Sequence, residues 1–151
     1  TRKFPLILTT GRVLSQYNVG QQTRRTENSK WHPEDRLEIH PHDAEERGIK
    51  DYDWIAIKSR AGHTTLRAAV TENVQPGVVY TTFHFPESGA NVITTKNSDW
   101  ATNCPEYKVT AVEVVRVFQP SEWQNRYQAF SDEQRRLLKE RRHTEKAEAR
   151  R

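Results

Sequence analysis

The sequence predicts a mainly β protein, a barrel of six or seven short strands with one or two short helices. Short apolar or alternating runs recur between residues 4 and 118, two long polar loops lie among them, and a helical period begins only after Pro120. Short strands with so much connecting loop fit a barrel better than an open sheet. We therefore expect a β-barrel domain over residues 1–120 and a charged, partly flexible helical extension over residues 121–151.

Six segments have the composition of strands. The first, FPLILTT, is a compact apolar run that ends in β-branched residues, which is typical of a buried strand. The others are RLEIH, then DWIAIKSRAG and TTLRAAVTENV joined around Gly62, then PGVVYTTFHF after a Pro-Gly turn, and finally the long alternating EYKVTAVEVVRVF. These segments make up the walls of the predicted barrel.

Helix signals occur in two places. PHDAEERG, residues 41–48, predicts one or two helical turns, because Pro41 suits the first helical position and Gly48 can supply a left-handed cap. After Pro120 the period changes to that of a helix. Two pairs there have the spacing of a capping box: Ser121 with Gln124, and Ser131 with Gln134.

The C-terminal extension carries most of the net positive charge. Residues 131–151 hold eight Lys or Arg and five acidic residues, and the whole chain has a formal net charge of +4. Proteins that track phosphates concentrate basic residues on the folded face that binds, so we predict no nucleic-acid partner. We expect Trp123, Tyr127 and Phe130 to form a helical stripe that docks on the barrel.

Cysteine and hydropathy patterns limit the compartment and the kinds of site. Cys104 is the one cysteine, so the chain has no internal disulfide and no CxxC ligand pair for zinc or an iron–sulfur cluster. A reducing, cytoplasmic location is the simpler interpretation. No apolar run reaches the length of a membrane span. The chain has no methionine, so we take it to be processed or cut from a longer one.

The first long loop holds one candidate site. In TTGRVLSQYN, residues 9–18, Gly11 lets the backbone approach an anion and Arg12 offers a guanidinium fork that fits a phosphate or carboxylate. Ser15, Gln16 and Asn18 add neutral hydrogen-bonding groups. The alternative is a polar surface loop with a glycine turn, and the residues alone leave both open.

The second long loop, PESGANVITTKNSDWATNCPEYK, holds a second candidate. Asn91, Asn97 and Asn103 could bind an amide-bearing heterocycle through paired donors and acceptors, although asparagine also favours turns. His40 and His42 flank Pro41 beside Asp43, but two histidines and one carboxylate are thin support for a metal, so we predict no metal site. Cys104 is interpreted as an inert thiol, and we predict no catalytic residue.

Four motifs in order then resemble a known family. PLILTTGRVLSQYN, EIHPHDAEERGIKDYDWIAIKSRAG, QPGVVYTTFHFPESGANVITT and NCPEYKVTAVEV are similar to the C-terminal domain of molybdopterin-dependent oxidoreductases of the dimethyl-sulfoxide-reductase family. Within that family the chain most resembles the α subunit of formate dehydrogenase. The tail QPSEWQNRYQAFSDEQ resembles the extension of the NAD-linked, cytoplasmic type. The resemblance implies a double-psi β-barrel that closes over bis(molybdopterin guanine dinucleotide).

The resemblance also implies the residues that meet this cofactor. Its pyrophosphates need cationic and N–H donors, and its rings need amides and carbonyls. The segment from His40 to Asp43 is expected to pack near it. The expected contacts are Thr10, Gly11, Arg12, Gln16, Tyr17, Phe83, His84, Asn91, Asn103, Tyr107 and Lys108. One departure is Tyr52, which stands where the family usually has a glycine in a turn.

The chemistry itself is expected elsewhere. The resemblance implies that a ligand outside this chain binds molybdenum or tungsten, so the chain alone is not catalytic. Its partners are then the N-terminal iron–sulfur and catalytic domains, and flavin and iron–sulfur subunits that pass electrons from formate to NAD, leaving CO2. The alternatives are the equivalent domain or small subunit of a nitrate reductase or formylmethanofuran dehydrogenase, and a non-redox binding barrel with a basic tail.

Overall fold

The computed structural model describes residues 1–148. The chain divides into two compact units, Thr1–Pro120 and a second unit that begins at Ser121, and each is described by itself.

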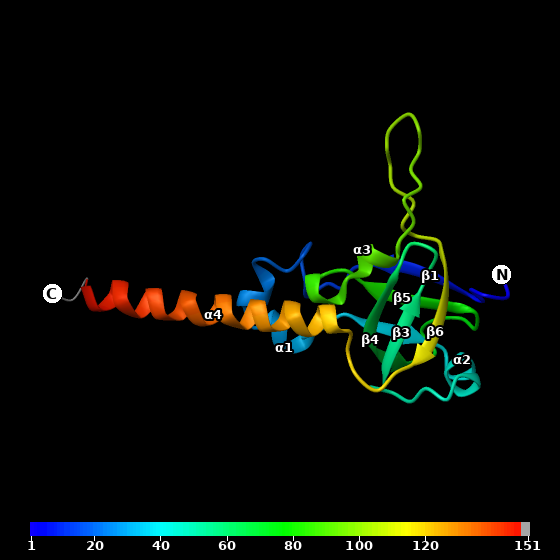
Figure 1. The fold of residues 1–151 in the computed structure, drawn as a ribbon, viewed down its shortest axis with the longest axis horizontal. Coiled ribbons are helices and arrows are strands. Elements are labelled where there is room, and N and C mark those ends of the chain that lie inside the picture. The colour runs from blue at the N-terminus through cyan, green and yellow to red at the C-terminus, as the bar shows by residue number, and fades with distance from the viewer. Residues whose placement is uncertain (149–151) are drawn as a thin grey trace. The chain divides into compact units, whose positions relative to one another are not determined.

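The first unit is a closed barrel of six strands (Figure 1). The strands are β1 (Leu6–Gly11), β2 (Arg36–Ile39), β3 (Trp54–Lys58), β4 (His63–Val70), β5 (Val78–Thr82) and β6 (Thr110–Arg116). They close in the order β1-β5-β2-β4-β3-β6, with β1 parallel to β5, β2 parallel to β4, and every other neighbour antiparallel. The predicted mainly β, double-psi barrel is confirmed.

The pairing has an approximate twofold symmetry that the sequence does not display. Exchanging β1, β2 and β3 for β4, β5 and β6 reproduces the same ring of neighbours and the same two parallel pairs. Helix α2 (Pro41–Glu46) follows β2, and the corresponding strand β5 is followed by α3 (Ala90–Ile93). The barrel is therefore built from two similar halves whose loops differ.

The barrel interior is filled by the inward-facing residues of all six strands. Period-two alternation places one apolar side chain of each pair inside, and each large aliphatic side chain that is fully buried contributes roughly 1.5–3 kcal/mol. The strand residues of this core are Leu6, Leu8, Leu37, Ile39, Ile55, Ile57, Leu66, Ala68, Val79, Val112 and Val114.

Strand direction defines two ends of the barrel. Gly11 pairs with Thr82 and Leu8 with Thr110, so the end of β1, the end of β5 and the start of β6 lie together. Because β2 runs antiparallel to β5, it leads α2 to the opposite end. There α2 begins at Pro41 as predicted, and His40 caps it, with its Nδ1 accepting the N–H of His42 at 3.1 Å.

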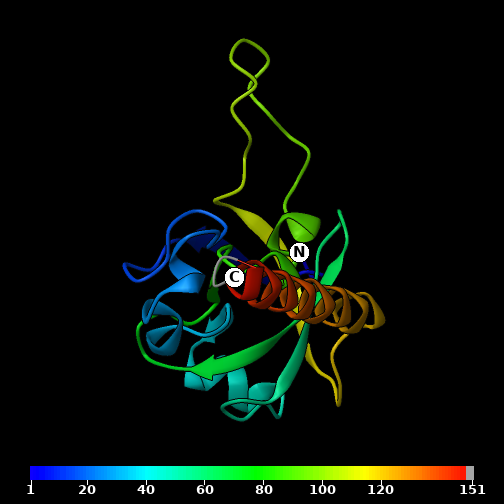
Figure 2. The same cartoon turned by 90° about the vertical axis from the view of Figure 1, so that its left-hand side faces the viewer.

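Both long polar loops contain short helices that the sequence analysis did not predict. The first loop has a 3-10 turn, Thr23–Arg25, and helix α1 (Asn28–Trp31). The second has a 3-10 turn, Pro86–Ser88, and α3, and continues as residues 94–109, the middle of which projects away from the barrel (Figures 1 and 2). We call residues 94–109 the arm.

The second unit is one helix, α4 (Glu122–Glu148). Its start is a capping box as predicted: the N–H of Ser121 donates to Oε1 of Gln124 at 3.0 Å, and the N–H of Gln124 donates to Oγ of Ser121 at 3.2 Å. The prediction of a second box at Ser131 was wrong, because the helix runs through that position. Among the described residues no helix is both long and apolar enough to cross a membrane.

Candidate functional site

The candidate site is at the end of β1, where the two loops meet. The hydroxyl of Thr10 donates to the carbonyl of Tyr107 at 2.9 Å, and Nζ of Lys108 donates to the carbonyl of Thr10 at 2.6 Å. Residues almost a hundred positions apart are thereby fastened together. Arg12 and Lys108, which the sequence assigned to one site from different loops, lie at the same end of the barrel.

Gly11 allows the strand to end against an aromatic ring. A Cβ at this position would lie 2.7 Å from Cε2 of Tyr80, so any side chain would displace that ring. The Tyr80 hydroxyl donates to the carbonyl of Arg12 at 3.2 Å. Burial, followed by the nearby Glu38 and Asp35, raises the pKa of Tyr80, so the phenol keeps its proton. The glycine and the tyrosine together fix the backbone that presents Arg12.

Arg12 presents an exposed cation. Its guanidinium carbon lies 5.4 Å from the centre of the Phe83 ring, and in the part of the chain that the structure describes it forms no ion pair. A cation over an aromatic face keeps its charge available to solvent. We call Thr10, Gly11, Arg12, Phe83, Tyr107 and Lys108 the Arg12 rim.

His84 holds the first loop in place. The ring is fully buried, its Nε2 accepts the N–H of Val13 at 3.0 Å, and its Nδ1 lies 2.6 Å from the carbonyl of Asn18. A carbonyl only accepts, so Nδ1 carries the proton and the ring is the neutral tautomer. Both ring nitrogens are occupied within the chain, so His84 positions the Arg12 loop from beneath.

Gln16 has a similar internal role. It is buried, its Oε1 accepts from the Thr23 hydroxyl at 2.6 Å, and its Nε2 donates to the carbonyl of His32 at 3.1 Å. Tyr17, next to it, is exposed. The Gln16 amide, which is an expected cofactor contact, is thus hydrogen-bonded within the loop. The adjacent Tyr17 ring is open to solvent and could meet a ligand.

The most connected residue of the site was missed by sequence reasoning. The carboxylate of Asp35 is buried and accepts from the N–H groups of His84 at 3.2 Å and Phe85 at 2.9 Å. It also accepts from the hydroxyls of Ser88, at 2.7 Å, and Thr82. One acidic residue before a strand gives no sequence signal for this role, because its partners come from a distant segment.

A second missed contact ties the two loops together. Arg24 pairs with Glu87 through both carboxylate oxygens, and its guanidinium carbon lies 4.7 Å from the centre of the Phe85 ring. Both charged side chains are largely buried. A two-point Arg–carboxylate pair fixes direction as well as distance, so the first loop has a defined position over the second.

The asparagines of the second loop do not join the Arg12 rim in the described contacts. Asn91 is exposed on α3. Asn103 is exposed in the arm with a φ of 54°, and its N–H donates to the carbonyl of Asp99 at 2.8 Å. This left-handed turn geometry is the alternative that asparagine favours. Cys104 beside it is exposed.

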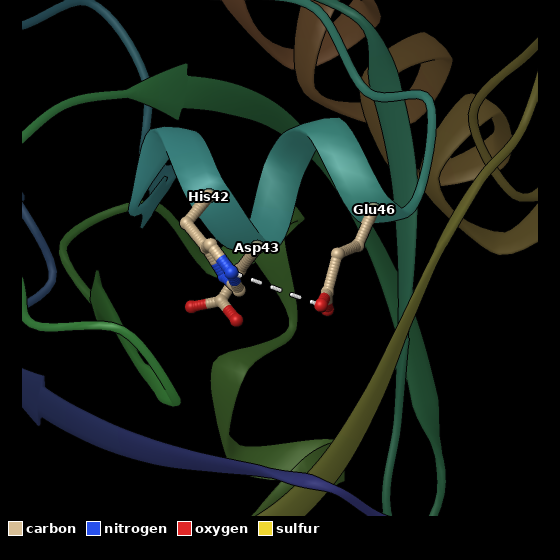
Figure 3. Close-up of side chains that lie close together, drawn as sticks. All are labelled: His42, Asp43 and Glu46. Atoms are coloured by element: carbon tan, nitrogen blue, oxygen red, sulfur yellow. Dashed lines mark ion pairs between the residues drawn. The ribbon is translucent and has the colours of Figure 1, made fainter.

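His40 and Asp43 lie at the opposite end of the barrel from the Arg12 rim. Oδ2 of Asp43 accepts the N–H of Gly77 at 2.7 Å, which fastens α2 to the turn before β5. Figure 3 shows Asp43 beside His42 and Glu46, whose ligand atoms lie within 4.8 Å of one another. Asp43 is already occupied by Gly77 and lies 3.7 Å from Arg47, and His42 and Glu46 form an exposed pair at 3.9 Å. The cluster is therefore explained by helix packing.

His32 should make the stability of the barrel depend on pH. Burial is the main cause that lowers the pKa of this ring below 6.5. The unfolded chain therefore takes up the proton first, and the free energy of unfolding should fall as the pH drops below 6.5, until the folded ring also protonates. Urea unfolding at several pH values should show this slope, and His32→Gln should reduce it. His63→Gln, at an exposed position, should leave the slope unchanged; an equal reduction there would contradict the assignment.

Comparison with known proteins decides the family. The protein-family model described as "Molydopterin dinucleotide binding domain" matches residues 6–111, more than half of the chain. The chain belongs to the molybdopterin dinucleotide-binding domain family. Its fold agrees, since the domain superposes on acetylene hydratase from Pelobacter acetylenicus with a TM-score of 0.67, at 18% identity, over 77% of this chain and 19% of that one. The predicted cofactor class is therefore confirmed.

Relatives of this dinucleotide-binding domain are parts of larger enzymes. It is 39% identical over 116 residues to F420-dependent formate dehydrogenase 1 subunit alpha of Methanococcus maripaludis, covering 76% of this chain and 17% of that protein. It is 34% identical over 119 residues to the assimilatory nitrate reductase catalytic subunit of Bacillus subtilis, covering 78% of this chain and 17% of that protein. The chain thus spans about a sixth of the length of these relatives.

The names of the relatives bear on the expected electron acceptor. The chain is also 39% identical over 117 residues to the F420-dependent formate dehydrogenase subunit alpha of Methanocaldococcus jannaschii. This match covers 77% of this chain and 17% of that protein. The resemblance to formate dehydrogenase α subunits is supported, whereas the NAD-linked type and tungsten find no support among these relatives.

Proposed function

We propose that this chain is the C-terminal cofactor-binding domain of a formate dehydrogenase α subunit, and that it holds and orients bis(molybdopterin guanine dinucleotide). The observation that carries this proposal is the Arg12 rim, where loops from two parts of the barrel bring Arg12 and Lys108 to one end. Two exposed cations beside a glycine that ends a strand suit a large anionic ligand. Family membership and the formate dehydrogenase relatives support the same assignment.

The roles of the residues follow from their contacts. Arg12 and Lys108 would pair with the pyrophosphate groups, and Tyr107 and Phe83 would border the ring systems. Thr10, Asp35 and His84 would position these groups, because each is hydrogen-bonded within the chain. The bound cofactor supplies the two-electron redox chemistry through a molybdenum or tungsten ion whose protein ligand lies outside this chain.

The full enzyme would oxidise formate to CO2 in the cytoplasm, and this chain alone would not. Its partners would be the iron–sulfur and catalytic domains of the same subunit, with flavin and iron–sulfur subunits for electron transfer. The proposed formate dehydrogenase could use one of two electron acceptors, NAD or F420. The C-terminal motif favours NAD, whereas the relatives named above are F420-dependent.

The test is to purify the complete enzyme that contains this chain and to measure formate-dependent reduction of F420 and of NAD separately, together with its molybdopterin content. Formate oxidation with either acceptor supports the assignment, and the faster acceptor identifies the type. The nitrate reductase alternative is favoured by the Bacillus subtilis relative. Nitrate reduction without formate oxidation in the same preparation would establish that alternative.

A further inference from the structure

A hollow separate from the Arg12 rim lies on the flank of the barrel, beside Val13 of the first loop. Its volume is about 200 Å³, and it opens across the outer surfaces of β2, β4 and β5 under the first loop. The residues that matter to its chemistry are Trp31, His32, Arg36, Glu38, Tyr52 and Tyr80. Of these, Tyr80 also contacts the Arg12 rim. The sequence analysis assigned no ligand to any of the other five.

Two polar atoms at this hollow lack partners. Among the described residues, Nε2 of His32 and Nε of Arg36 are buried and form no hydrogen bond within the chain. The other end of Arg36 is held, since one Nη donates to Asp51 and to the carbonyl of Ala68, both at 3.0 Å. A fixed guanidinium with a buried, unpaired N–H costs free energy unless a bound group accepts from it.

Tyr52 forms one wall of the hollow in an unfavourable backbone conformation. Its φ is 65°, in the left-handed region where glycine is the ordinary residue. Its ring lies 4.0 Å from the guanidinium carbon of Arg36, so it stacks on that group and faces the hollow. A strained residue that supplies a binding wall is more often found at functional sites than at ordinary turns.

The hollow combines flat aromatic walls with both kinds of hydrogen-bonding group. Arg36 offers an N–H donor, and Glu38 offers a carboxyl that accepts when ionised. Burial raises the pKa of Glu38 and lowers that of His32, and the Arg36 cation is already paired with Asp51 at 3.0 Å. Because Arg36 already has a carboxylate partner, and the carboxyls of Glu34 and Glu38 line the same hollow, this hollow suits an uncharged ligand better than a phosphate.

We propose that this hollow binds a neutral, planar heterocycle whose edge carries a carbonyl beside an N–H, as in a free nucleobase. The carbonyl would accept from Nε of Arg36, the N–H would donate to Glu38, and the ring would lie between Tyr52 and Tyr80. A cavity of about 150 Å³ holds one aromatic ring, so this hollow admits one ring or a small fused pair. The site is separate from the dinucleotide site of the proposed function.

The experiment titrates the full 151-residue chain with uracil and follows its amide resonances by two-dimensional NMR. Saturable shifts are expected around Val13, Tyr52 and Thr82, with a Kd of about 1 mM, which is reasonable for so small a ligand. N,N′-dimethyluracil, which has the same ring but no N–H, should bind about tenfold more weakly. These two ligands separate amide-edge recognition from simple stacking.

Tyr52→Gly is the decisive variant. It removes the wall and relieves the left-handed backbone, so the chain should still fold, and uracil binding should weaken about tenfold. Trp100→Ala, at an exposed position in the arm, should leave binding unchanged. Absence of saturable shifts, equal binding of dimethyluracil, or unchanged binding by a folded Tyr52→Gly variant would each overturn the proposal.

The complete enzyme tests whether the hollow binds a free heterocycle or a ring of the bound dinucleotide. Tyr52→Gly should leave its molybdopterin content unchanged if the hollow takes a free ligand. Loss of the cofactor from that variant would show that the hollow holds one end of the dinucleotide, and would overturn a separate site while leaving the proposed function intact.

Discussion

Asp35→Ala should lower the free energy of unfolding of the chain by about 4 kcal/mol. The substitution leaves the N–H groups of His84 and Phe85 and the hydroxyls of Thr82 and Ser88 without their common acceptor. Each hydrogen bond to a buried charge is worth roughly 1.5–3 kcal/mol, and some of the loss is recovered as the site relaxes. Urea unfolding followed by circular dichroism measures the change.

Two further variants make this prediction specific. Asp35→Asn keeps one acceptor oxygen but places an NH2 group among the donors, so it should lose about half as much stability. Glu72→Gln removes the same charge from an exposed position and should change the free energy of unfolding by less than about 0.5 kcal/mol. If Asp35→Ala shifts the unfolding midpoint no further than Glu72→Gln does, the buried carboxylate does not organise the two loops.

Arg12→Ala should reduce cofactor retention in the complete enzyme by about tenfold to a hundredfold. A charge-assisted contact to a phosphate contributes roughly 1.5–3 kcal/mol, which corresponds to that range in affinity. Arg12 is exposed and forms no ion pair within the described chain, so its removal should not unfold the barrel. The measurement is molybdopterin content after extended dialysis, with circular dichroism as the check on folding.

Arg2→Ala provides the matched control, because Arg2 is an exposed arginine before β1, at the other end of the barrel. It should retain the cofactor like the parent enzyme. Lys108→Ala should act in the same direction as Arg12→Ala, with an additional loosening of the second loop, since its Nζ also holds the carbonyl of Thr10. If a folded Arg12→Ala enzyme retains all of its molybdopterin, the Arg12 rim is not part of the cofactor site.

The elements of the barrel could be predicted because their signals are local. Alternation in TAVEVVR, the capping residues around Pro41, and the box at Ser121 each act within a few positions of the chain. The candidate residues Thr10, Arg12 and Lys108 were proposed from a strand end and a motif resemblance, and the structure places Thr10 and Lys108 in contact. The short helices inside the two loops were not predicted, because they depend on packing rather than on periodicity.

What the sequence could not indicate is how the side chains of the loops are used. The resemblance predicts His84 and Gln16 as cofactor contacts, and the structure shows that both side chains also have hydrogen-bond partners within the chain. Asp35 looks like a surface residue, yet its partners Thr82 and Ser88 lie 47 and 53 positions away. Such contacts depend on how two loops cross, and no local pattern records that.

The sequence alone predicted a β-barrel from strand periodicity, and its ordered motifs resemble a dinucleotide-binding family, because both signals are properties of consecutive residues. Only the tertiary structure decided which residues share an end of the barrel. The antiparallel pairing of β2 with β5 sends His40 and Asp43 to one end, whereas the pairing of β1 with β5 and β6 brings Arg12 to Lys108 at the other. Strand direction is fixed by closure of the whole ring, and closure requires all six strands at once.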